Sequence, residues 1–366
     1  MGPFGSVSYW ALQCMNLITG NVDREGGLLQ PKGPFDLLKL TSLLGVGTHD
    51  RATRDGRYRG VADALPAAML AEEILRPGDD RIRALVVTSG NPVHSIPGGR
   101  MAEALDALDL LVCIDIYPSE TTRHAHYLLP ATDMLERTDY PLTLSLNQAT
   151  PWAQYTERMV EPAFERREEW AIFTDLAVAA GSPLRPTLCH VFSAVNRALA
   201  ALGRKTRLDP DAVLALLFRV LGDISLADVR AHPHGMLLAP MAAGTFLGKR
   251  VFTKDRRVDL APEGLVADLS RVRAMEGGFT KGDGLVLIGR REKKSHNSWM
   301  HNHEGLRQPA SPTALLHPDD ARDRGIAHGD LVRLSGNGAS LDVPVELTPD
   351  IRRGVVVMPH GFGHEA

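Results

Sequence analysis

Residues 84–130 read ALVVTSGNPVHSIPGGRMAEALDALDLLVCIDIYPSETTRHAHYLLP, and this stretch decides the fold. Residues 84–89 and 110–116 are short apolar runs, which are typical of strands buried on both faces of a sheet. Between them, residues 99–108 carry apolar side chains at helical spacing. A strand, a helix and a strand over about thirty residues form a βαβ unit, so we expect the two strands to be parallel.

Two loops follow the carboxyl ends of these strands, at residues 90–97 and 116–122. Ligands of open parallel sheets bind at this edge. The first loop offers backbone N–H groups beside a helix N-terminus, which suit a phosphate, and Asp115 suits a ribose hydroxyl. The G-x-G-x-x-G fingerprint is absent, so two interpretations stay open. One is a nucleotide site, and the other is a plain turn with a strand-end acid.

The segments SGNPVHSIP (89–97) and CIDIYPSETTRHAHYLLPATDMLER (113–137) resemble the molybdopterin oxidoreductase family, which includes dimethyl sulfoxide reductase and formate dehydrogenase. In that family, these segments cradle a molybdopterin guanine dinucleotide. Glu136 also matches the family pattern, whereas His126 stands where the family usually has Asp. The resemblance implies cofactor contacts at Gly90, Asn91, Pro92, Asp115, Glu120 and Thr121.

The composition argues against several classes of protein. A net charge of −3 and an isoelectric point near 6.5 argue against a nucleic-acid partner. No apolar run approaches the roughly 20 residues of a membrane span, and residues 1–16 lack a signal-peptide pattern. Cys14, Cys113 and Cys189 form no C-x-x-C pair, which predicts a reducing compartment, no disulfide framework, and no iron–sulfur or structural zinc site built from these cysteines. We expect a cytoplasmic protein, with a periplasmic location kept open.

The length of 366 residues suits two or three domains. We expect an α/β domain over residues 1–180, with helices at 10–20, 65–75 and 170–180 and a loop excursion of little core at 28–66. A helical and linker region is expected over residues 181–280, with helices across 186–228. There, Asp209-Pro210-Asp211 predicts a helix start. That helix carries apolar residues on every side, which predicts deep burial.

Residues 281–366 predict a small mixed β-barrel. Strands are expected at 285–288, 330–334, 340–347 and 354–358, with a helix at 316–325. Gly336-Asn337-Gly338 between alternating segments is typical of a hairpin. Residues 317–364 resemble the C-terminal domain of the same family, a six-stranded double-psi β-barrel of the aspartate-decarboxylase-like type. The family's barrel continues past the corresponding PHG motif, so we expect a truncated barrel. The predicted fold class is therefore α/β, with a parallel-sheet domain, a helical linker region and a double-psi β-barrel.

Residues 289–302 are dense in hydrogen-bond donors. Arginine suits phosphate, and Ser, Asn and His suit the polar edge of a pterin. A zinc site is one alternative, although no Cys or acid lies at ligand spacing; a purely structural loop is another. The resemblance implies that the pterin and diphosphate contact Arg290, His296, Asn297, Ser298, Met300, His301 and Asn302, with His360 near the same cofactor.

The resemblance implies the cofactor-binding C-terminal part of a molybdenum or tungsten bis-molybdopterin guanine dinucleotide oxidoreductase, similar to formate dehydrogenase or nitrate reductase. The dinucleotide is expected between the α/β domain and the barrel, and the expected partners are a small redox substrate and electron-transfer subunits. The family's metal ligand and iron–sulfur cysteines precede the region covered here. No catalytic residue is therefore assigned, and the chain alone is expected to be inactive. The alternatives are a non-catalytic structural subunit of an electron-transfer complex and, less favoured, a nicotinamide dehydrogenase.

Overall fold

The chain is described by a computed structural model, which groups its residues into two compact units, Met1–Pro262 and Glu263–Ala366. The three-part division expected from the sequence stays a prediction. The structure describes residues 4–44, 51–62, 64–96, 98–142, 144, 148, 150–180, 201–202, 210–275, 284–301, 303–306, 312–336 and 338–362.

The first unit contains a parallel sheet of three strands in the order β1-β2-β3, formed by Ala84–Thr88, Leu110–Asp115 and Tyr127–Pro130. Val87 pairs with Cys113, and Cys113 with Leu128. The predicted strand–helix–strand unit is thereby confirmed, and both predicted loops lie at the carboxyl edge of this sheet.

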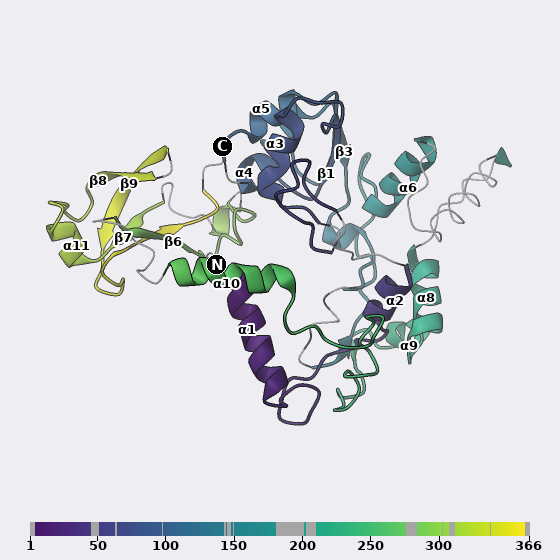
Figure 1. Cartoon of the computed structure of the whole chain (residues 1–366). Helices are drawn as coiled ribbons and strands as arrows, with labels where there is room; N and C mark the ends of the chain where they lie inside the picture. Colours follow the sequence, from purple (N-terminus) through teal and green to yellow (C-terminus); the bar gives the residue numbers. More distant parts are fainter. Residues whose placement is uncertain are drawn as a thin grey trace. The chain divides into compact units, whose positions relative to one another are not determined.

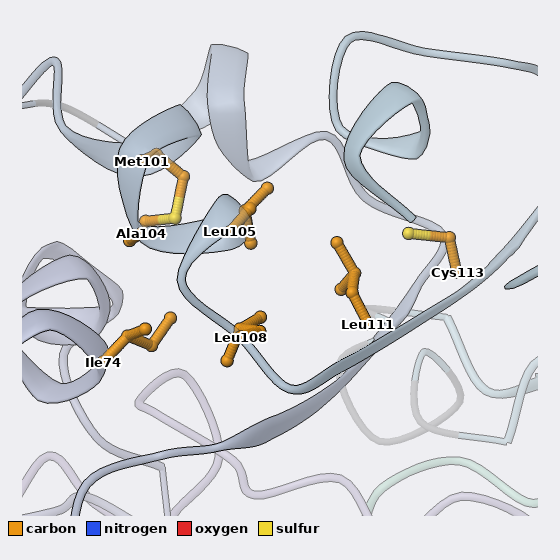
Figure 2. Packing of buried hydrophobic residues seen from close by; sticks show 7 residues of the cluster. All are labelled: Ile74, Met101, Ala104, Leu105, Leu108, Leu111 and Cys113. Atoms are coloured by element: carbon orange, nitrogen blue, oxygen red, sulfur yellow. The ribbon is translucent and has the colours of Figure 1, made fainter. Parts of the chain in front are cut away.

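Helices α3 (Leu70–Leu75) and α5 (Met101–Asp106) contribute the core beside the sheet (Figure 2). Ile74, Leu105 and Leu111 are fully buried in this cluster. Strand β2 is buried on both faces, as predicted. The same prediction for β1 is wrong, because Val86 keeps 49% of its surface exposed. Strand β1 pairs only with β2 within the described sheet, and the described core lies on one of its faces.

A second core of the first unit joins segments far apart in the chain. Phe35, Tyr155 and Phe218 are buried together, and the rings of Phe35 and Phe218 meet edge to face at 5.3 Å. The expectation that residues 28–66 contribute little core is therefore wrong around Phe35. Helix α8 (Pro210–Leu221) was expected to be deeply buried, yet Val220 is 66% exposed. Only one face of α8 packs against this core, so apolar residues on its other face meet solvent.

The remaining elements of the first unit are α1 Gly5–Ile18, α2 Leu37–Leu44, η1 Ala67–Met69, α4 Pro92–Ser95, η2 Thr122–His124, η3 Met134–Glu136, β4 Trp152–Ala153, α6 Glu169–Ala179, α9 Leu226–Arg230 and β5 Met236–Leu237 (Figure 1). Helices α1, α3 and α6 confirm the three helices predicted for residues 1–180. Helix α1 begins five residues earlier than predicted, α3 is shorter, and α6 is shifted by one residue. The predicted helical residues 186–200 and the predicted cap Asp209 lie outside the described residues.

The second unit contains a mixed five-stranded sheet in the order β6-β10-β7-β9-β8. Its elements are α10 Glu263–Ala274, β6 Val286–Arg290, η5 Glu304–Leu306, β7 Ala314–Leu316, α11 Pro318–Arg322, β8 Leu331–Gly336, β9 Ala339–Leu347 and β10 Val355–Pro359. The predicted hairpin is confirmed, because β8 and β9 pair antiparallel up to Gly336 and Ala339. Residue 337 at its tip lies outside the described residues.

Strand β7 was missed by the sequence prediction, which began a helix at residue 316. Its three residues are all buried, and β7 pairs with both β9 and β10. Three residues are too few to show a period, whereas the following helix has a clear start. That helix begins at Pro318, and the His317 side chain accepts the N–H of Asp319 at 3.1 Å.

None of the helices in the described part of the chain is both long enough and apolar enough to cross a membrane.

Candidate functional site

The side chain of Asn91 brings the two predicted loops of the first unit together. Its Oδ1 accepts the hydroxyl of Thr121 at 2.7 Å and the N–H of the same residue at 3.3 Å. Its Nδ2 donates to Oε2 of Glu120 at 2.5 Å. The resemblance placed all three residues at the cofactor, and the structure brings them together at the carboxyl ends of β1 and β2.

Thr121 also reaches the short helix α4, because its Oγ1 accepts the N–H of Val93 at 3.1 Å. Thr121 is fully buried, and Pro92 at the start of α4 is buried as well. Neither side chain is exposed to solvent at this sheet edge. Short helix α4 was not predicted, because four residues show no helical period.

Asp115 lies at the end of β2 and shapes the loop that follows. Its Oδ1 accepts the N–H groups of Ile116 at 2.7 Å and Tyr117 at 3.3 Å. Its Oδ2 has no hydrogen bond to any residue that the structure describes, so this oxygen can accept a donor from a ligand. Burial and the charge of Asp115 raise the pKa of the Cys113 thiol, which therefore stays neutral as the predicted small hydrophobe.

The chain leaves β1 through Ser89, which adopts a left-handed φ of 51°. Its N–H still donates to the carbonyl of Ile114 at 3.0 Å, so the ladder extends one residue past the strand. A left-handed conformation is unfavourable for a residue with a Cβ. No signal in the sequence marks Ser89, and this turn places Gly90 and Asn91 beside the second loop.

Arg290 ends β6 in the second unit and lies beside the end of β10. Arg290 and Pro359 form the last pair between β6 and β10. The next residue, His360, donates its N–H to the Arg290 carbonyl at 3.1 Å. The guanidinium group forms an ion pair of 2.7 Å with Glu292. Its Nε is buried and has no hydrogen-bond partner among the described residues. Arg290 and His360 were predicted for the same cofactor, and the structure places them together.

Asn297 joins the donor-rich segment to the loop after β10. Its Oδ1 accepts Nε2–H of His360 at 2.8 Å and a guanidinium N–H of Arg291. The Asn297 carbonyl approaches Gly361 so closely that a Cβ at position 361 would overlap it. Gly361 has a φ of +94°, which also favours glycine. Arg291 lies in the donor-rich segment but was not predicted to contact the cofactor, so its bond to Asn297 is a structural finding.

The other predicted residues of the donor-rich segment, residues 289–302, do not share one set of contacts. His296 meets Trp299 edge to face at 6.1 Å, and the rings of His301 and Phe362 lie 5.1 Å apart. Ser298 and Met300 are half-buried, and Asn302 lies outside the described residues. Among the described residues, no three His, Cys, Asp or Glu side chains gather as a metal site.

His126, the position that departs from the family pattern, lies at the opposite end of the sheet from these loops. Its Nδ1 accepts the N–H of Leu111 at 2.9 Å. A carboxylate can accept the same bond, which gives a physical reason why His and Asp can both occupy the position. Glu136, which matches the pattern, is buried, completes the capping box of η3 and pairs with Arg166 at 2.8 Å.

Two family models match the chain, one within each unit. Residues 3–179 match the molybdopterin oxidoreductase model, and residues 285–366 match the molydopterin dinucleotide binding domain. The chain belongs to the molybdopterin oxidoreductase family. As a member of this family it is an oxidoreductase-family protein with a domain for a molybdopterin-type cofactor.

Relatives of this molybdopterin oxidoreductase family member differ in their named activities. It is 24% identical to dimethyl sulfoxide/trimethylamine N-oxide reductase of Rhodobacter capsulatus, over 98% of this chain and 47% of that protein. It is 23% identical to the F420-dependent formate dehydrogenase subunit alpha of Methanocaldococcus jannaschii, over 96% of this chain and 50% of that protein. NADPH-Fe(3+) oxidoreductase subunit alpha of Geobacter sulfurreducens is 25% identical over 77% of this chain and 27% of its own length. The chain thus spans about half or less of these relatives.

Acetylene hydratase from Pelobacter acetylenicus is similar in fold, with a TM-score of 0.58 and 18% identity. The match covers 83% of this chain and 40% of that chain.

Proposed function

We propose that this chain binds a molybdopterin guanine dinucleotide, with the guanosine at the loops after β1 and β2. The pterin and diphosphate are proposed to contact residues 290–302 and His360. The observation that supports this most directly is the match of residues 285–366 to a dinucleotide-binding domain, because the donor-rich segment lies within it.

The residues of the second unit suit an anionic group. Arg291 and His360 both donate to Asn297, and Arg290 at the end of β6 pairs with the carboxylate of Glu292. The buried Nε of Arg290 has no partner in the described part of the chain. A buried polar group without a partner carries a free-energy penalty. The Arg290 side chain as a whole keeps 39% of its surface exposed, so the accessible part of its guanidinium group could donate a charge-assisted bond to a phosphate oxygen.

The first unit suits the other end of the molecule. A nucleoside presents N–H and O–H donors, and Oδ2 of Asp115 is an acceptor at the edge where parallel sheets bind ligands. Gly90, in the loop after β1, is half-buried. We propose that Asp115 accepts a donor of the guanosine. Glu120 would act from the same loop through its bond to Asn91.

The bound group would supply two-electron redox chemistry through molybdenum or tungsten. The residues of this chain would bind and orient it. We propose an activity of the formate dehydrogenase or nitrate reductase type within a larger assembly with electron-transfer subunits. Two relatives are named as alpha subunits, which is consistent with such an assembly. We also propose that the sheet of the second unit belongs to a double-psi barrel. Any iron–sulfur cluster of the enzyme is proposed to lie outside this chain. We propose a cytoplasmic location.

The direct test is the cofactor content of the purified chain. The chain is produced in a host that makes the dinucleotide and is then denatured. Guanine nucleotide, pterin fluorescence, molybdenum and tungsten are each measured against protein. Release of guanine nucleotide and pterin in near-equal amounts supports the proposal. A chain without either would favour a non-catalytic subunit, and release of a nicotinamide nucleotide would favour a dehydrogenase. Both results would overturn the proposal.

A further inference from the structure

We propose that Thr121 is a positioning residue, which holds the two nucleotide loops together through Asn91 and does not itself contact the dinucleotide. We call the hydrogen-bonded arrangement of these two residues, with Glu120 and Val93, the Asn91 clasp. The assignment deepens the proposed function and rests on it only for the identity of the ligand. It differs from the sequence prediction at Thr121, which was placed among the contacts of the cofactor.

The orientation of the Asn91 amide follows from its partners. The ionised Glu120 carboxylate can only accept hydrogen bonds, so it must face the Asn91 NH₂ group. The backbone N–H of Thr121 can only donate, so it must face the Asn91 oxygen. Both ends of the amide are therefore engaged by the second loop. Asn91, in the loop that follows β1, therefore binds the loop that follows β2.

The Thr121 hydroxyl carries the other half of the clasp. It donates to Asn91 at 2.7 Å and accepts from Val93 at 3.1 Å. The residue has 0% exposed surface, so a ligand at the sheet edge cannot reach this hydroxyl without opening the loops. A buried hydroxyl with its donor and an acceptor position both in use is typical of a structural role.

The clasp has a consequence for binding. Loops that are held before the ligand arrives lose less conformational entropy when it binds. Residues 116–122 form the loop after β2, and the first of them, Ile116, donates its N–H to the Asp115 carboxylate. Residues 91–96 form the facing loop, which contains α4. Removing the Thr121 hydroxyl should therefore loosen both loops in the free protein and weaken nucleotide binding as a result.

The test compares Thr121→Val with Thr121→Ser in the full chain. Valine keeps the shape and removes the hydroxyl, whereas serine keeps it. Thr122→Val is the matched control, because Thr122 is also buried but, among the described residues, its hydroxyl bonds to Ser119 of its own loop and not to the facing loop. Hydrogen exchange of residues 93–96 and 116–122 is measured without ligand. The affinity for GDP is measured by calorimetry.

We expect Thr121→Val to speed exchange in both loops and to weaken GDP binding roughly five- to tenfold. Thr121→Ser should restore both properties, and Thr122→Val should leave exchange at 93–96 unchanged. Weaker GDP binding with unchanged exchange in the free protein would overturn the proposal, because it would indicate direct contact. Unchanged binding despite faster exchange would also overturn it.

The two proposals fail in different ways. If the parent chain binds no GDP, the proposed function fails, while exchange in the ligand-free variants still decides whether the clasp holds the loops. Asn91→Ala is the second variant, in case Thr121→Val does not fold. It removes the same bridge from the other side, and faster exchange at 116–122 is the expected result. Unchanged exchange there would overturn the clasp.

Discussion

The guanidinium group of Arg250 forms a buried ion pair with the carboxylate of Asp36, although 214 residues separate them in the chain. Nε of Arg250 lies 2.7 Å from Oδ2 of Asp36, and both side chains are almost fully buried. Arg250 also donates to the carbonyls of Gln30 and Pro31. This one side chain therefore fixes residues 30–36, from which Phe35 enters the second core of the first unit.

Asp36→Asn should destabilise the first unit, because it leaves the buried Arg250 charge without its counter-ion. Loss of one partner of a buried pair costs about 3 kcal/mol. The free energy of unfolding is measured by urea titration. Asp342→Asn is the matched control, because the Arg333–Asp342 pair lies on the surface of the β8–β9 hairpin, and its loss should change stability little. Equal effects of the two variants would contradict the role of the buried pair.

The same pair predicts how stability depends on pH. Burial alone raises the pKa of Asp36, but the hydrogen bond and charge of Arg250 outweigh burial, so the pKa lies below the ordinary value of 3.8. A carboxyl with a lowered pKa in the folded state stabilises the fold above its ordinary pKa. It loses that contribution as the pH falls through the lowered value. The stability difference between the parent and Asp36→Asn should therefore be full at about pH 7 and shrink below about pH 4. A difference that grows with acid would refute this account.

His126→Leu should destabilise the parallel sheet. The change removes the acceptor of the Leu111 N–H, and Leu111 is fully buried. A buried donor left without a partner costs about 1–3 kcal/mol. His126→Asp provides an acceptor at the same position and should lie closer to the parent in urea titration. If the Leu and Asp variants are equally stable, the His126–Leu111 bond does not stabilise the sheet.

Gly361→Ala should displace the segment of residues 295–301. The new Cβ would overlap the Asn297 carbonyl, in addition to the strain of a left-handed φ. Gly338→Ala is the matched control, because Gly338 also has a left-handed φ, of +82°, but open space around a Cβ. Near-equal losses of thermal stability in the two variants would show that the close approach to Asn297 does not contribute to the effect of Gly361→Ala. We expect the larger loss, with faster hydrogen exchange at 295–301, for Gly361→Ala.

Arg290→Ala should lower the pterin content of the purified protein, and Asp115→Ala should lower it by a smaller amount. Each charge-assisted hydrogen bond that is lost costs about 1.5–3 kcal/mol. Arg333→Ala removes a surface arginine of the same unit and serves as the control. Full pterin content in the Arg290→Ala protein would contradict the proposed contact with the cofactor.

The sequence predicted those parts of the molecule that depend on local patterns. Short apolar runs and helical spacing identified the strands and the helix in residues 84–116, and the Gly-Asn-Gly turn between alternating segments identified the hairpin of β8 and β9. Motifs pointed to the two loops that Asn91 joins. These features are local because backbone conformation and turn geometry are set mainly by neighbouring residues.

Local patterns failed wherever the answer depends on distant neighbours. The apolar run at residues 84–88 does not indicate that β1 pairs with only one described strand. The apolar residues around α8 do not indicate which face of the helix packs against Phe35 and Tyr140. Strand β7 is too short to be recognised, and it is defined by its pairing with β9 and β10.

Local sequence patterns were enough to identify the family, the parallel strand pair, the hairpin and the residue types offered to a dinucleotide. Only the tertiary structure decided that Asn91 and Thr121 bind each other, that Asn297 and Gly361 lie in contact, and that Asp36 neutralises Arg250. The reason is physical. A side chain's hydrogen bonds, burial and charge environment depend on the groups that surround it in space, and those groups come from segments that only folding brings together.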